Sequence, residues 1–329
     1  TPEPSPQTLQ DDAARAEAAG LAVKGISQIQ SASAAYGEQQ VYLAASNGFE
    51  GGYTRTDRGL SCVAIAGSGT AMERDYDGDS RIFQADLRSP EAIGTQAAQR
   101  TLERMDARKP PTGAYPVLFD ERISSTLIGH LLAAINGSAI ARGASWLRDA
   151  MGEQVLPDGL SIIENPHRPR TSGSRPFDGE GLPTNRRVIV ENGTLKGWTL
   201  DLATARKLGM APTGNAARGP GSNPSPAVWN IELTQGDATR DDLIKQMGTG
   251  LLVTSMIGST INPNTGDYSR GASGLWIENG EITHAINECT IAGNLRDMLG
   301  SIIPANDARR HLSRVVPSLL VPGMTLAGA

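Results

Sequence analysis

The stretch YPVLFDERISSTLIGHLLAAINGSAIARGASWLRD, residues 115–149, predicts a β-strand followed by two helices. Residues 115–119 form a short apolar run, and Asp120 is well suited to cap the helix that follows. Apolar side chains then recur at every fourth position, namely Ile123, Leu127, Leu131 and Ile135. Gly137 should end this helix, and a second short helix over 138–148 should pack beside it. His130 lies in the middle of the first helix and is the only histidine of the stretch.

The composition of the whole chain restricts the classes of protein to which it can belong. Its 329 residues are enough for two domains or one large one. The 30 Lys and Arg against 35 Asp and Glu give a net charge of −5, which argues against a nucleic-acid-binding surface spread over the protein. No apolar run approaches the roughly 20 residues that span a bilayer, and no basic-then-apolar leader is seen. We therefore expect a cytoplasmic protein that binds neither nucleic acid nor a membrane.

The two cysteines, Cys62 and Cys289, lie in separate apolar, strand-like segments. Cysteine is among the residue types most often buried, and disulfides are rare in the cytosol. We therefore predict two reduced thiols in the protein core, in preference to a disulfide or a pair of metal ligands.

The N-terminal third predicts two helices around a run of strands. Residues 6–21 form an alanine-rich helix capped by Ser5, and residues 90–108 form a helix capped by Ser89. Between them, strands are expected at 39–45, 53–56, 61–66 and 71–76, joined by turns into a meander. The acidic turn 75–79 resembles a calcium loop only superficially, because its glycine is misplaced and no glutamate follows at the twelfth position. A break at 109–113 leads us to divide the chain into an α+β domain, 1–112, and a C-terminal domain, 113–329.

The C-terminal part contains two similar hairpin sequences, IVENGTL at 189–195 and WIENGEI at 276–282. Asn-Gly between apolar strands is the strongest short-range signal for a β-hairpin. Helices are expected at 202–208, 240–247 and 294–302, and strands at 161–164, 229–233, 251–257 and 318–326. Residues 165–183 form a long loop rich in Pro, Arg, Ser and Gly. The predicted fold class is α+β, with mixed or antiparallel sheets, packed helices and a C-terminal domain of repeated hairpins.

The common catalytic signatures are absent from the sequence. There is no Gly-x-Ser-x-Gly elbow, Walker loop, Cys-x-x-Cys or His-Glu-x-x-His. The four histidines, His130, His167, His284 and His311, are far apart in sequence, so each favours a structural or surface role. Asp178 and Glu180 are the best acid–base candidates, because the glycines around them permit close approach of a substrate.

Six segments of the C-terminal part follow one another in a characteristic order. They are Phe177-Asp178-x-Glu180-Gly181, Ala205-x-x-Leu208-Gly209, Gly250-Leu251-Leu252-Val253-Thr254, Thr265-Gly266-Asp267-Tyr268-Ser269, Gly274-x-Trp276-Ile277-Glu278-Asn279-Gly280 and Thr290-Ile291-Ala292-Gly293-Asn294-Leu295. Together they resemble the TldD/PmbA family, once called modulators of DNA gyrase, and within it the PmbA branch, also called TldE. The match extends over essentially the whole chain and is specific in the order of its parts. The resemblance also implies a further N-terminal α/β segment ahead of this chain.

The resemblance implies a cytosolic two-subunit peptidase in which the TldD-type subunit holds zinc through a His-Glu-x-x-x-His helix and a distal cysteine. On this sequence the motif falls at residues 125–130, where only His130 matches. Ser125 replaces a ligand, Thr126 replaces the carboxylate that activates water, and residues 306–318 contain no cysteine. A hydrolytic zinc site needs three protein ligands, a water and a nearby base, which one histidine cannot supply.

We therefore predict that this chain has no metal site and no catalytic residue, with Ser125, Thr126 and His130 as degenerate motif positions. Candidate substrate-binding residues are Asp178, Glu180, Tyr268 and Arg270. The predicted function is that of the non-zinc subunit of a TldD–TldE metallopeptidase that degrades or processes unfolded peptides, with zinc in the TldD-type partner and no cofactor in this chain. A homodimer is an alternative assembly for the isolated chain. Two other functions stay open: a stand-alone hydrolase that uses the Asp178/Glu180 loop, and a non-enzymatic binding or regulatory protein.

Overall fold

The computed structural model describes residues 2–328, apart from the side chain of Ser259. The chain forms two compact units. The first unit comprises the chain up to Tyr42, Gly52–Arg108 and His284–Ile286, and the second comprises Leu43–Gly51, Lys109–Thr283 and the chain from Asn287 onward. None of the described helices is both long and apolar enough to cross a lipid bilayer.

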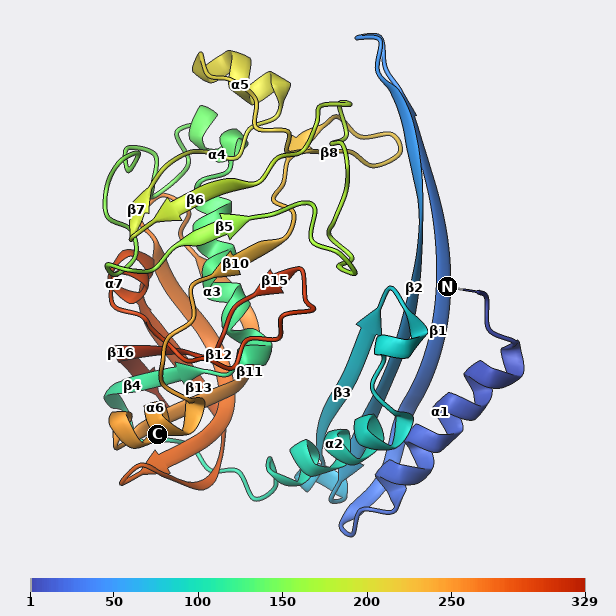
Figure 1. Cartoon of the computed structure of the whole chain (residues 1–329). Helices are drawn as coiled ribbons and strands as arrows, with labels where there is room; N and C mark the ends of the chain where they lie inside the picture. The colour runs from blue at the N-terminus through green and yellow to red at the C-terminus, as the bar shows by residue number, and fades with distance from the viewer. Residues whose placement is uncertain (1, 329) are drawn as a thin grey trace. The chain divides into compact units, whose positions relative to one another are not determined.

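The first unit is a three-stranded sheet with two helices against it (Figure 1). The strands are β1 (Ile26–Ala44), β2 (Glu50–Ala66) and β3 (Glu73–Arg81), in the order β1-β2-β3, and the helices are α1 (Pro6–Leu21) and α2 (Pro90–Leu102). Ser5 and Ser89 cap the two helices as predicted, each accepting a hydrogen bond from a backbone N–H of the first turn. The core between helices and sheet consists of Ala16, Leu60, Cys62, Ala64, Ile93, Ala97 and Ala98.

The predicted four-stranded meander is wrong, because three long strands occupy this region. The expected turn at 57–59 is part of β2, where Arg58 is 1% exposed and its guanidinium lies 3.0 Å from the Asp12 carboxylate. The acidic residues at 75–79 lie within β3, where Asp77 is 2% exposed and binds two arginines. Polar residues that usually indicate turns are here buried ion-pair partners. The helix predicted to reach residue 108 ends at Leu102.

The second unit contains a six-stranded sheet that closes on itself. Its order is β13-β12-β11-β4-β16-β14, and β13 also pairs with β16, so five of the strands form a ring. Strand β4 pairs in parallel with β11 and antiparallel with β16. The strands are β4 (Gly113–Phe119), β11 (Gly250–Ile261), β12 (Asp267–Glu278), β13 (Glu281–Asn294), β14 (Ile303–Pro304) and β16 (Leu319–Ala327).

A five-stranded sheet, a two-stranded sheet and five helices complete the second unit (Figure 1). The five-stranded sheet has the order β15-β10-β5-β6-β7. Its strands are β5 (Ile162–Glu164), β6 (Arg187–Glu191), β7 (Thr194–Leu195), β10 (Ile231–Leu233) and β15 (Arg314–Val315). The two-stranded sheet pairs β8 (Ala216–Ala217) with β9 (Ser225–Pro226). The helices are α3 (Glu121–Ala134), α4 (Gly137–Ala141), α5 (Leu202–Leu208), α6 (Arg240–Met247) and α7 (Leu295–Gly300).

The predicted strand and first helix of residues 115–149 are confirmed as β4 and α3. Asp120 caps α3 by accepting a hydrogen bond from the Arg122 N–H at 3.1 Å, and the apolar face of the helix is buried. The second helix is shorter than predicted. Gly137 begins α4 instead of ending α3, because the Asn136 side chain caps the new helix, and a turn follows at Gly143, whose φ is +70°.

Both Asn-Gly hairpins are confirmed. Asn192 and Gly193, like Asn279 and Gly280, have positive φ angles, as a type I′ turn requires. The hairpins lie in different sheets of the second unit, β6–β7 in the five-stranded one and β12–β13 in the six-stranded one. The predicted α+β class with mixed sheets is also confirmed. Both cysteines are free and buried, and burial raises the pKa of each thiol to about 11.

Candidate functional site

The site suggested by the sequence lies on the half-buried face of α3. Ser125, Thr126 and His130 are all half-buried there. The Thr126 hydroxyl donates to the Ile123 carbonyl at 2.7 Å, so it is used within the helix. The His130 ring packs edge-on against Tyr268, with 5.7 Å between ring centroids, and its Nε2 atom is buried without a hydrogen-bond partner.

These residues do not fit a zinc ion. Zinc sites are built from His, Cys, Asp and Glu side chains, and hydrolytic sites need three of them. Across residues 2–328, no group of three or more such side chains is placed to hold a metal. Of the three motif positions, only His130 carries a side chain of a type that commonly binds zinc. Ser125 and Thr126 offer hydroxyl groups, which bind zinc poorly.

The structure places Tyr268 and Arg270 beside His130. Both lie on β12, two residues apart and therefore on the same face of the strand. Tyr268 is 2% exposed, its hydroxyl contacts the Met256 sulfur at 3.4 Å, and burial raises its pKa to about 12. The Nε–H of Arg270 donates to the Gly258 carbonyl at 2.8 Å. Two of the four proposed substrate-binding residues thus adjoin the degenerate motif.

Asp178 and Glu180 hold their own loop in place. Asp178 is 2% exposed, and its carboxylate accepts hydrogen bonds of 2.9 Å from the backbone N–H groups of Glu180, Leu182 and Ala216. Glu180 accepts from the Leu202 N–H at 2.9 Å, in the first turn of α5. Burial raises the pKa of Glu180, this hydrogen bond opposes the shift, and the charges of Asp201 and Asp178 add to it. In the described structure neither carboxylate forms a hydrogen bond or ion pair with His130, Tyr268 or Arg270.

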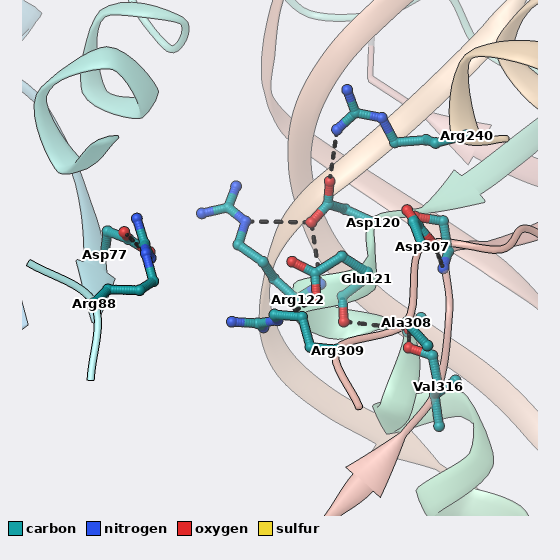
Figure 2. A network of polar contacts seen from close by, with 12 residues as sticks. Asp77, Arg88, Asp120, Glu121, Arg122, Arg240, Asp307, Ala308, Arg309 and Val316 are labelled. Carbon is teal, nitrogen blue, oxygen red and sulfur yellow. Dashed lines mark hydrogen bonds and ion pairs between the residues drawn. The ribbon is translucent and has the colours of Figure 1, made fainter. Parts of the chain in front are cut away.

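The first turn of α3 carries a network of ion pairs that sequence reasoning missed (Figure 2). Asp120 lies 3.3 Å from the Arg122 Nε and 3.5 Å from an Arg240 nitrogen, and Glu121 lies 2.6 Å from the Arg309 Nε. Burial raises the pKa of Glu121, although Arg309 acts in the opposite direction. No sequence signal links these residues, because Arg240 and Arg309 are more than a hundred positions away from the helix.

His130 should make the second unit less stable in acid. Burial lowers the pKa of His130 from its ordinary value of 6.5, and the charge of Arg270 lowers it further. A lowered folded-state pKa means that the unfolded chain binds more protons, so this contribution is present above 6.5 and is lost as the pH falls through the folded-state pKa. We expect His130→Asn to reduce the loss of stability between about pH 7 and about pH 5, measured by tryptophan fluorescence during urea unfolding. An unchanged pH dependence would contradict this assignment.

Comparison with protein families matches nearly the whole chain. Residues 1–105 match the PmbA/TldA metallopeptidase central domain, and residues 112–328 match the PmbA/TldA metallopeptidase C-terminal domain. The metalloprotease PmbA of Escherichia coli O157:H7 is 40% identical over 330 residues, covering 99% of this chain and 71% of that protein. The PmbA homologue of Haemophilus influenzae is 42% identical over 287 residues, covering 86% of this chain and 61% of its own length.

Solved structures agree with these matches. A Bacteroides thetaiotaomicron protein described as a modulator of DNA gyrase superposes with a TM-score of 0.91 and 31% identity, covering 99% of this chain and 72% of its own. TldE of Thermococcus kodakarensis has a TM-score of 0.86 at 21% identity, which shows a shared fold; the match covers 99% of this chain and 75% of that one. The chain belongs to the PmbA/TldD family of peptidase-related proteins.

Proposed function

We propose that this chain is the TldE/PmbA-type subunit of a cytosolic two-subunit peptidase, and that it helps to enclose unfolded peptides beside the zinc of a TldD-type partner. One observation supports the proposal: where the resemblance to the TldD/PmbA family implies a metal-binding helix, α3 holds Ser125 and Thr126 at the motif positions. Its apolar side, including Leu127, Ile128 and Leu131, is fully buried. The opposite, half-buried side is left to small polar residues and His130.

Extended peptides are the substrates that this fold suits best. Among the described strands, β1 is hydrogen-bonded to β2 alone, so its other edge offers backbone N–H and C=O groups over a strand of 19 residues. An unfolded peptide can add to such an edge as a further strand, gaining main-chain hydrogen bonds that do not depend on its sequence. This is a mode of binding expected of a peptidase that accepts many unfolded chains.

The test is to measure metal content and peptide cleavage for this chain, for its TldD-type partner, and for the two mixed. We expect stoichiometric zinc in the partner only, a stable complex in the mixture, and cleavage that requires the complex. Because His130 is not a ligand in this proposal, His130→Ala should leave the zinc content of the mixture unchanged. Stoichiometric zinc on this chain alone, with cleavage lost on His130→Ala, would overturn the proposal.

A stand-alone hydrolase is the second candidate, and the raised pKa of Glu180 favours it, since a protonated carboxyl is suited to general-acid catalysis. Against it, the Asp178 carboxylate is held by three backbone N–H groups and is poorly placed to move a proton. Cleavage by the chain alone that is insensitive to chelator and lost on Glu180→Gln would establish this function. A chain that binds its partner but supports no cleavage would instead indicate the purely regulatory role.

A further inference from the structure

The middle of α3 is flanked by two arginines that have no anionic partner among the described residues. Arg314 comes from β15, and one of its guanidinium nitrogens lies only 3.2 Å from where a Cβ on Gly129 would stand. Arg270 comes from β12 and lies close to the next residue of the helix, His130, through their common neighbour Tyr268. Neither guanidinium forms an ion pair with a carboxylate in the described structure.

Both arginines have N–H groups to spare. The Nε–H of Arg270 is bound to the Gly258 carbonyl, and the side chain also forms a hydrogen bond with Tyr268. These contacts fix the side chain and still leave N–H groups on its guanidinium for a ligand. Arg314 is exposed, and its backbone is held by the parallel pairing of β15 with β10. The buried Nε2 of His130 also lacks a partner. The guanidinium groups of Arg270 and Arg314 and the imidazole of His130 thus lie at one part of the helix without an anionic partner.

The first turn of α3, more than two turns closer to the N-terminus, carries carboxylates that all have cationic partners. Asp120 pairs with Arg122 and Arg240, and Glu121 pairs with Arg309, so each carboxylate of the first turn is neutralised (Figure 2). From Arg122 to His130 the helix sequence RISSTLIGH contains no acidic residue. Arg270 and Arg314 therefore approach a part of α3 that has no carboxylate of its own.

We propose that this part of α3 binds a carboxylate of an extended peptide, held by Arg314 beside Gly129 and by Arg270 beside His130. This inference deepens the proposed peptide-binding function and rests on it. A guanidinium presents a planar fork of N–H groups that matches the two oxygens of a carboxylate. Gly129 has no side chain, which leaves room for the Arg314 guanidinium beside the helix backbone. The carboxylate is supplied either by the C-terminus of the peptide or by an Asp or Glu side chain, and the two sources can be separated by experiment.

The experiment uses N-acetylated octapeptides of Ser, Thr and Val, titrated into the chain by calorimetry. One peptide ends in a free carboxylate, one in an amide, and one in an amide with a single internal Glu. Hydrogen bonds to charged groups contribute about 1.5–3 kcal/mol, so we expect a carboxylate-bearing peptide to bind about tenfold or more tightly than the plain amide. Preference for the free acid identifies the C-terminus as the ligand, and preference for the Glu peptide identifies an acidic side chain.

Variants test whether the two arginines are responsible. The quantity compared is the affinity for the preferred carboxylate peptide divided by the affinity for the plain amide. Arg270→Gln and Arg314→Gln should each reduce this ratio. Arg206→Gln, which replaces an exposed arginine of α5, should leave it unchanged. Thermal unfolding confirms that each variant is folded. Equal binding of all three peptides by the unmodified chain, or an unchanged ratio in both arginine variants, would overturn the inference. Cleavage by the mixed subunits without carboxylate preference would refute this site alone, whereas selective binding without any cleavage would refute the proposed function alone.

Discussion

Arg187→Met is expected to lower the free energy of unfolding of the second unit by about 3–5 kcal/mol, because it leaves a buried carboxylate without its counter-charge. The partner is Glu164, which is 1% exposed and lies 2.5 Å from the Arg187 Nε. Arg187 also donates to the Trp198 carbonyl at 2.9 Å and to the Thr199 hydroxyl at 2.8 Å. Its loss therefore leaves several buried acceptors unsatisfied.

Glu164 cannot move to water when the arginine is removed. Its other oxygen accepts hydrogen bonds from the Asn215 side chain at 3.0 Å and from the Trp229 N–H, and its backbone is in β5 between β6 and β10. The carboxylate must then either stay charged in a buried place or take up a proton. Each response costs stability, and the second makes the loss smaller at low pH.

Urea unfolding followed by tryptophan fluorescence provides the measurement, since all four tryptophans lie in the second unit. Lys196→Met is the matched control: its ion pair with Glu191 is exposed, so its removal should change stability by less than about 1 kcal/mol. The double variant Glu164→Leu with Arg187→Met should recover part of the loss, because no charge is then left unpaired. A single-variant loss no larger than that of the control would contradict the role given to this pair.

Local sequence signals predicted the elements whose ends are determined by their own residues. Helix α1 begins as predicted because Ser5 caps it and Pro6 occupies its first position. Helix α5 ends at Gly209 because that residue adopts φ +65°, which glycine tolerates best. The two hairpins follow from the positive φ angles that Asn-Gly favours.

Signals that depend on distant partners were misread. The residues around Arg58 and Asp77 predict turns, yet both side chains are buried in strands, because Asp12 neutralises Arg58 and Arg88 and Arg100 neutralise Asp77. The candidate site shows the same limit. The family resemblance points to His130, whereas Tyr268 and Arg270 come to lie near it because β12 pairs with β11, which contacts α3. Arg314, the remaining member of the cluster, has no sequence pattern that connects it to Gly129.

Gly94→Ala should destabilise the first unit by up to about 2 kcal/mol, although alanine is the better helix former. A Cβ on Gly94 would lie 2.0 Å from the Ala16 carbonyl oxygen and 3.1 Å from the Gly20 nitrogen, both backbone atoms of α1. Helix propensity alone favours alanine by about 1 kcal/mol. Overpacking typically costs about 1–3 kcal/mol, and here no flexible side chain can move aside, so the two helices must separate. Steric cost should therefore exceed the gain in propensity.

Hydrogen exchange of peptides from α1 and α2, measured by mass spectrometry, reports on this unit separately from the tryptophan signal. In Gly94→Ala both helices should exchange faster, and the fluorescence transition of the second unit should be unchanged. Gln99→Ala provides the control, because this residue of α2 is exposed and its replacement brings only a small gain in propensity. Slower exchange in Gly94→Ala would mean that α1 and α2 have room to accept a methyl group, and that close contact at Gly94 does not determine how the two helices pack.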